Sequence, residues 1–151
     1  MIKSLSKLRG RLTLAFLLLS TLTFIFLHSL TPAAASAETS GGVYDLLSRL
    51  FGFLPFLTHA TVRKAAHFAE YVLLGFLSFF FPRVFLKGKW QEYLSLIPFA
   101  ILIAGVDELL QFLAPGRVPL LADVLIDLGG FLFGLLLSLL FQYLWHKRRA
   151  L

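Results

Sequence analysis

The feature that most limits the fold of this chain is the length of its apolar segments. The first, residues 12–30, contains 19 residues without a formal charge, close to the ~20 residues that cross about 30 Å of bilayer hydrocarbon as a helix. Similar segments follow at approximately 62–81, 93–113 and 120–145. Lipid offers no partners for unpaired backbone groups, and the chain is too short for a closed barrel. We therefore expect an all-α fold, a four-transmembrane-helix bundle that forms one domain over residues 1–151.

The composition agrees with a membrane protein and excludes several other classes. Hydrophobic residues make up 58% of the 151 residues and charged residues 15%, against about 45–50% and 25% in soluble domains. A disordered chain, a nucleic-acid-binding tail and an ordinary cytosolic enzyme do not fit these values. The absence of cysteine excludes disulfides, zinc–thiolate sites and thiol nucleophiles. The lipid bilayer is the expected partner, with no nucleic acid and no cofactor.

The basic residues predict how the bundle is oriented. Four precede the first segment, three lie between the second and third, and three follow the fourth: Lys3, Lys7, Arg9, Arg11; Arg83, Lys87, Lys89; Lys147, Arg148, Arg149. Because Lys and Arg concentrate in cytoplasmic loops, we expect both termini in the cytoplasm. The basic start and the sequence Ala-Ser-Ala at 35–37 also resemble a signal peptide. However, the apolar run exceeds the usual 7–15 residues, so we expect an uncleaved anchor.

The predicted outer loop, residues 31–61, has two parts. Residues 31–42 are small and polar, which predicts a mobile linker. Residues 42–57 are apolar but too short to span comfortably. They could lie flat in the outer interface, re-enter partway, or pack over the mouth of the bundle.

Most acidic residues fall at one depth of the predicted bundle. Five of the eight lie within or at the edge of the segments: Glu70, Asp107, Glu108, Asp123 and Asp127. An acid near the bilayer centre costs about 2.5–3.5 kcal/mol, so these side chains are expected to face the interior. With the alternating direction of the segments, all five lie in the outer half. Polar neighbours at three- and four-residue steps complete a predicted outward-facing pocket: Lys64, His67 and Tyr71 in the second segment, and Gln111 in the third.

Small residues continue the polar face of the fourth segment. Gly130, Gly134 and Ser138 follow Asp127 at steps of three and four, a pattern typical of helices that pack closely. Gly75 in the second segment is expected to pack in the same way. The sequence thus predicts a polar mouth above a tightly packed base.

The pocket residues have alternative roles. His67, Glu70, Asp107, Glu108 and Asp123 are candidate catalytic acid–base residues, and Lys64, Tyr71, Gln111, Arg117 and Asp127 are candidate ligand-binding residues. Arg117 lies in a Pro-Gly-Arg-Val-Pro turn that would hold it over the mouth, where a guanidinium suits phosphate or carboxylate.

Some of these acids, together with His67, also have the chemistry of metal ligands. Asp107, Glu108 and Asp123 with His67 could bind a divalent cation, but neutralisation of Lys and Arg by these acids is favoured, so no metal site is predicted. His28, His59 and His146 match no chemical constellation and are interpreted as interfacial. Ser29 has no predicted base nearby and is a poor nucleophile candidate.

Three blocks of the sequence resemble the VanZ-like membrane protein family. Residues 64–75 match K-x-x-H-F-x-E-Y-x-x-L-G, and residues 107–117 match D-E-x-x-Q-x-x-x-P-G-R. Residues 123–134 match D-x-x-x-N-x-x-G-x-x-x-G, except that Asp127 stands where the family more often has Asn. Residues 25–32 are a weaker match to the end of the family's first span. The resemblance implies a bacterial multi-pass membrane protein of the cell envelope, with a link to teicoplanin resistance.

These observations lead to one expected function and two alternatives. We expect a protein of the bacterial cytoplasmic (inner) membrane whose pocket binds an anionic envelope component, such as a lipid-linked cell-wall precursor or a phospholipid head group. It would affect glycopeptide (teicoplanin) susceptibility, with Lys64 and Arg117 holding the anion. The first alternative is a membrane enzyme that performs acid–base hydrolysis or group transfer on such a lipid. The second is a small transporter, which the apolar inner half does not favour.

Overall fold

The computed structural model describes residues 2–51 and 58–149, and within these ranges the chain is helical with no strand. The described ranges contain seven helices: α1 (Ile2–Ser29), α2 (Ala33–Phe51), α3 (His59–Ser78), α4 (Phe81–Phe85), α5 (Trp90–Leu94), α6 (Leu96–Leu113) and α7 (Leu121–Arg149). The expected all-α class is confirmed.

Among the described residues, four stretches are long and apolar enough to cross a membrane: Leu5–Ser29, His59–Phe85, Trp90–Leu113 and Leu121–Arg149. The short helices α4 and α5 belong to the ends of the second and third stretches. This confirms the expected bundle of four transmembrane helices. The first and fourth stretches extend beyond the predicted apolar runs because the helices continue into their basic ends.

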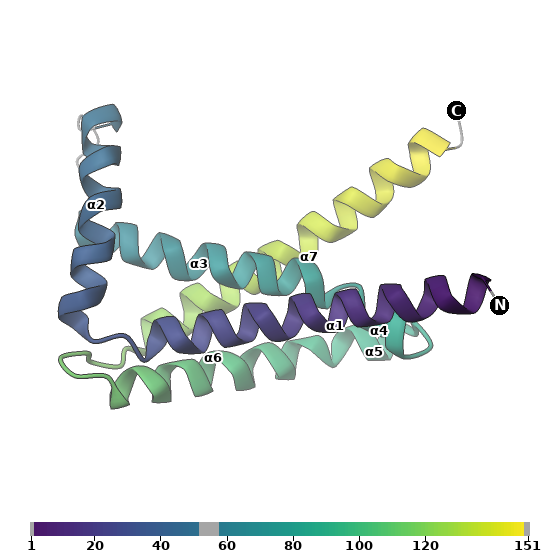
Figure 1. Ribbon diagram of the computed structural model, residues 1–151, viewed down its shortest axis with the longest axis horizontal. Coiled ribbons are helices and arrows are strands. Elements are labelled where there is room, and N and C mark those ends of the chain that lie inside the picture. The colour runs from purple at the N-terminus through teal and green to yellow at the C-terminus, as the bar shows by residue number, and fades with distance from the viewer. Residues whose placement is uncertain (1, 52–57, 150–151) are drawn as a thin grey trace.

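The long helices pack along one another (Figure 1). α1 contacts both α3 and α6, and α7 contacts α3 and α6. α7 crosses α3 at a slant, and its last turns extend away from the bundle (Figure 1). The N- and C-terminal ends lie toward the same end of the molecule (Figure 1), as an even number of crossings requires.

The prediction of a mobile linker over residues 31–42 is wrong, because Ala33–Phe51 forms the continuous helix α2. The backbone N–H of Ala33 donates to the carbonyl of Pro115 at 3.0 Å, and Ser36 is buried, so the start of α2 is held against the bundle. α2 runs across the long axis of the other helices (Figure 1). Its Tyr44 ring contacts the His59 ring of α3. Residues 52–57 belong to the apolar segment 42–57, for which the sequence left three possible placements, and they lie outside the described residues.

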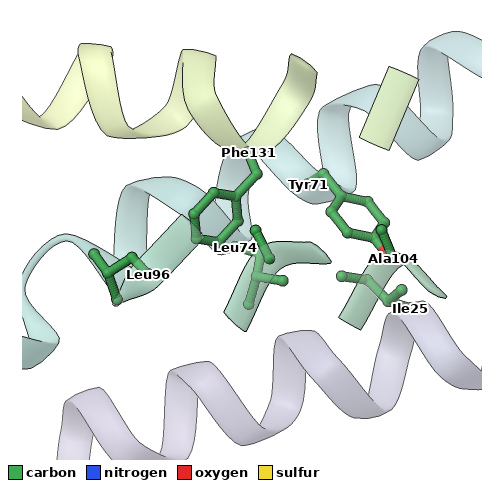
Figure 2. Packing of buried hydrophobic residues seen from close by; sticks show 7 residues of the cluster. Ile25, Tyr71, Leu74, Leu96, Ala104 and Phe131 are labelled. Carbon is green, nitrogen blue, oxygen red and sulfur yellow. The ribbon is translucent and has the colours of Figure 1, made fainter. Parts of the chain in front are cut away.

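The apolar core lies between the four long helices (Figure 2). Each of them contributes buried side chains to one cluster: Ile25 from α1, Tyr71 and Leu74 from α3, Leu96, Ala100 and Ala104 from α6, and Phe131 from α7. The outward faces carry large exposed hydrophobic side chains such as Phe16, Leu102 and Leu136. Such faces suit lipid, which is as apolar as the side chains themselves.

α3 and α7 make the most extensive contact of the described fold, and small residues of α7 face backbone carbonyls of α3. The facing pairs advance by four residues on both helices: Gly130 with Phe68, Gly134 with Val72 and Ser138 with Phe76. A Cβ atom on Gly130 or Gly134 would overlap the opposing carbonyl oxygen. The Ser138 hydroxyl instead donates a hydrogen bond to its carbonyl at 2.8 Å. The close packing predicted for these residues is thus confirmed.

Replacing Gly134 by Ala is expected to destabilise the protein by about 1–3 kcal/mol, because the added methyl group forces two helix backbones apart. The matched control is Gly129→Ala on the same helix, where the Cβ would meet only Phe68 Cε2 at 3.9 Å. This control is expected to be neutral or slightly stabilising, since Ala favours helix over Gly by up to about 1 kcal/mol. The measurement is the temperature at which purified protein in detergent loses its monodisperse size-exclusion peak. Equal transition temperatures for the two variants would contradict the close packing of α7 on α3.

Candidate functional site at one end of the bundle

Polar side chains gather where the C-terminal ends of α1 and α6 meet the N-terminal halves of α3 and α7. We call this region the polar end. It contains the ten residues singled out from the sequence: Lys64, His67, Glu70 and Tyr71 on α3; Asp107, Glu108 and Gln111 on α6; Asp123 and Asp127 on α7; and Arg117 in the loop between α6 and α7. It also contains His28 and Ser29, the last residues of α1. In the structure, most of these residues form separate small groups, each of which connects two elements of the fold.

The first contact joins α1 to α3 through His28 and Glu70. His28 Nδ1 lies within hydrogen-bonding distance of Glu70 Oε1, at 2.7 Å. The His28 ring stacks over that of His67, with centroids 5.0 Å apart and an interplanar angle of 9°. His67 Nδ1 lies 3.8 Å from Glu70 Oε2. The prediction that His28 belongs to no chemical constellation is therefore wrong.

The second contact joins α1 to α6 through Asp107, which is fully buried. The Ser29 hydroxyl donates to Asp107 Oδ1 at 2.5 Å, and Gln111 Nε2 donates to Oδ2 at 3.3 Å. Both carboxyl oxygens therefore have a partner, which offsets part of the cost of burying them.

Two further contacts secure the start of α7. Lys64 Nζ lies 2.9 Å from Asp123 Oδ1, an ion pair between α3 and α7 whose lysine side chain is 35% exposed. Glu108 Oε1 accepts a hydrogen bond from the backbone N–H of Leu120, the residue before α7. A carboxyl group at this position suits the unpaired N–H groups and the positive dipole end of a helix.

Arg117 fastens the loop to the end of α1. Its Nε donates to the carbonyl of Thr31 at 2.9 Å and its Nη2 donates to the carbonyl of His28 at 3.3 Å. Gly116, with φ of 77°, provides the left-handed turn that precedes it. Burial lowers the pKa of the Arg117 guanidinium, as does the charge of Arg63, whereas nearby carboxylates oppose this shift. The guanidinium is thus partly desolvated and held by backbone oxygens.

Several buried polar atoms at the polar end have no hydrogen-bond partner among the described residues. These are both ring nitrogens of His67, Glu70 Oε2, the Tyr71 hydroxyl, Glu108 Oε2, Arg117 Nη1, both carboxyl oxygens of Asp127, and Asp123 Oδ1, which has only its ion-pair contact with Lys64. Since most buried polar atoms in proteins are paired, such a concentration is typical of a binding or catalytic site. Tyr71 also belongs to the apolar core, where its ring points toward α6 (Figure 2).

A cavity of about 430 Å³ lies in the other half of the bundle. Its lining is almost entirely apolar: Ala15, Leu18, Leu19, Leu22, Ser78, Phe81, Phe85, Ser95, Leu96 and Phe99. This cavity contains none of the ten predicted site residues. The outward-facing polar pocket therefore stays a prediction.

The fold and the polar end define an all-helical membrane protein of four spans with acids and imidazoles concentrated at one end of the bundle. Residues 14–142 match the VanZ/LLP1 family, and since this range covers most of the chain, the protein belongs to that family. The three sequence blocks that resemble VanZ-like proteins all lie within the matched range. Searches of curated proteins and of solved structures gave no match.

Sequence reasoning missed His28 and Ser29 of the first span. Both lie at its C-terminal end, at the depth predicted for the other polar groups, and within the weaker family match over residues 25–32. Their depth in the bundle was therefore the signal that could have identified them. The spacing of residues within one helix could not identify them, because their partners Glu70 and Asp107 are on other helices.

Replacing Ser29 by Ala is expected to destabilise the protein by about 1–2 kcal/mol, because one buried carboxyl oxygen of Asp107 loses its donor. The matched control is Ser20→Ala, on the exposed face of the same helix, with an expected change within about 0.5 kcal/mol. Thermal midpoints in detergent measure both. A Ser29 variant as stable as the Ser20 control would contradict a stabilising role for this hydrogen bond.

Proposed function

We propose that the protein resides in the bacterial cytoplasmic membrane with both termini in the cytoplasm and the polar end facing outward. The distribution of charge supports this orientation. Arg11 and Arg83 lie toward the same end as the basic C-terminal turn of α7, and that end is also where the two termini lie (Figure 1). Lys and Arg mark the cytoplasmic side of membrane proteins.

The absence of native cysteine allows a direct test of this orientation. Single-cysteine variants at exposed positions on the two sides, Glu38→Cys and Lys147→Cys, are treated with a membrane-impermeant maleimide in intact cells. The Glu38 variant is expected to be labelled, and the Lys147 variant is expected to react only after lysis. The reverse labelling pattern would refute the proposed orientation.

The polar end is proposed to bind an anionic group of an envelope component, either a lipid-linked cell-wall precursor or a phospholipid head group. The observation that carries this proposal is the state of Arg117. Two of its nitrogens are fixed on backbone carbonyls, while Nη1 is buried with no partner among the described residues. A guanidinium held in place with a free donor suits a phosphate or carboxylate oxygen. Lys64, paired with Asp123 but still partly exposed, would supply a second positive charge.

Such binding is proposed to alter teicoplanin susceptibility, by changing the envelope component that the drug meets. The family match supports this role only through the association of VanZ with glycopeptide resistance. An enzymatic role is the second candidate, and one observation favours it. His67 is buried beside Glu70 with both ring nitrogens unpartnered, as a general base acting on a bound lipid would need. No comparable observation favours transport, since the core below the polar end is apolar.

Teicoplanin susceptibility of a host that expresses the protein tests the binding proposal. Cells with wild-type protein are expected to be less susceptible than cells without it, and Arg117→Gln is expected to abolish this difference by removing the anchored cation. Arg49→Gln, at an exposed position on α2, is the control and is expected to behave like wild type.

A measurement of the lipids and cell-wall precursors in the same strains distinguishes the two candidate functions. Membrane abundance of each variant is measured in parallel, so that a misfolded Arg117 variant is recognised. A new lipid product in wild-type cells that disappears with His67→Ala would favour the enzyme. Equal susceptibility with and without the protein, at equal growth, would contradict the resistance role.

A further inference from the structure

One group of side chains at the polar end has the spacing of metal ligands. His28, His67 and Glu70 each offer one ligand atom, and these atoms all lie within 4.8 Å of one another. His67 and Glu70 are one helical turn apart on α3, while His28 reaches them from α1. Two imidazoles and one carboxylate are the three protein ligands of a common class of zinc sites, in which a fourth position remains open.

A second observation points independently to a ligand at this position. The His67 side chain is 10% exposed, yet neither of its ring nitrogens has a hydrogen-bond partner among the described residues. Glu70 Oε2 is buried and unpartnered as well. A buried imidazole with two free nitrogens loses its hydration without compensation. A bound cation between His67 and Glu70 would provide that compensation.

Two of the acids that the sequence suggested as metal ligands already have partners. Asp107 accepts from Ser29 and Gln111, and Asp123 pairs with Lys64. The set considered from the sequence, these acids and Glu108 with His67, is therefore not the one with ligand spacing in the described chain. His28, which the sequence left without a role, completes the set instead.

We propose that His28, His67 and Glu70 bind a divalent transition-metal ion, for which zinc is the best match. Zinc binds imidazole nitrogen at 2.0–2.1 Å in a tetrahedron, which places ligand atoms about 3.3 Å apart. The two rings, now stacked at 9°, turn about their side-chain bonds so that one nitrogen of each converges on the ion. The 2.7 Å contact between His28 and Glu70 shows that these side chains reach one another across the two helices. This inference does not depend on the proposed anion binding.

The test measures zinc in purified full-length protein that carries a purification tag without histidine. The protein is stripped with a chelator, equilibrated with zinc, separated from free metal and assayed by mass spectrometry for metal per chain. Wild type is expected to hold one zinc, and His28→Ala, His67→Ala and Glu70→Gln are expected to hold almost none at the same free zinc concentration. His146→Ala is the control: this exposed histidine near the end of α7 should leave the zinc content unchanged.

A second measurement uses only the wild-type protein, so that it does not depend on the folding of variants. X-ray absorption of the zinc-loaded protein is expected to show two imidazole nitrogens in the ligand shell. Wild type without stoichiometric zinc, a shell of oxygen atoms alone, or folded His28 and His67 variants that keep their zinc would each overturn the proposal. Arg117→Gln is expected to lose the effect on teicoplanin but retain zinc, which separates failure of the metal site from failure of the anion site.

Discussion

The constraint on which this structure depends is that a carboxyl group inside a membrane bundle needs a partner from the protein. Water cannot supply one at depth, and an unpaired acid is costly there. For Glu70, Asp107 and Asp123, the polar end meets this constraint with contacts that each join two elements. Glu70 meets His28 between α3 and α1, and Asp107 meets Ser29 between α6 and α1. Asp123 meets Lys64 between α7 and α3. The acids therefore determine which helices are neighbours at this end.

The α3–α7 seam determines the register in which those acids can meet their partners. Carbonyls of α3 lie against Gly130 and Gly134, so the two helices cannot slide without a clash or a gap. About two helical turns before Gly130, the same register brings Asp123 to Lys64. The ion pair therefore depends on the close packing of small residues between α3 and α7, because that packing fixes the register of the two helices.

The sequence was sufficient for the spans and the depth of the polar groups, because both follow from local patterns. The length of apolar runs and the three- and four-residue steps of Asp127, Gly130 and Gly134 need no knowledge of neighbouring helices. The partner of each acid could not be predicted in this way, since His28 and Ser29 meet their acids across more than 40 residues of chain. α2 was missed for a related reason. Its Gly41 and Gly42 disfavour helix locally, whereas the contact of Ala33 with Pro115 and the packing on α3 stabilise it.

The charge balance of the polar end connects its structure to its chemistry. Five carboxyl groups share the polar end with the positive side chains of Lys64 and Arg117, and with Arg63 as a third charge near Arg117: those of Glu70, Asp107, Glu108, Asp123 and Asp127. When these acids are ionised, their excess negative charge repels an anionic ligand unless part of that charge is offset. A divalent ion on His28, His67 and Glu70 would offset it at the position where the unpaired nitrogens and oxygen lie. It would also leave the guanidinium of Arg117, which is fixed on the end of α1, free to attract a phosphate or carboxylate. Recognition of an anion by an acid-rich membrane site is therefore easier to explain with a bound cation than without one.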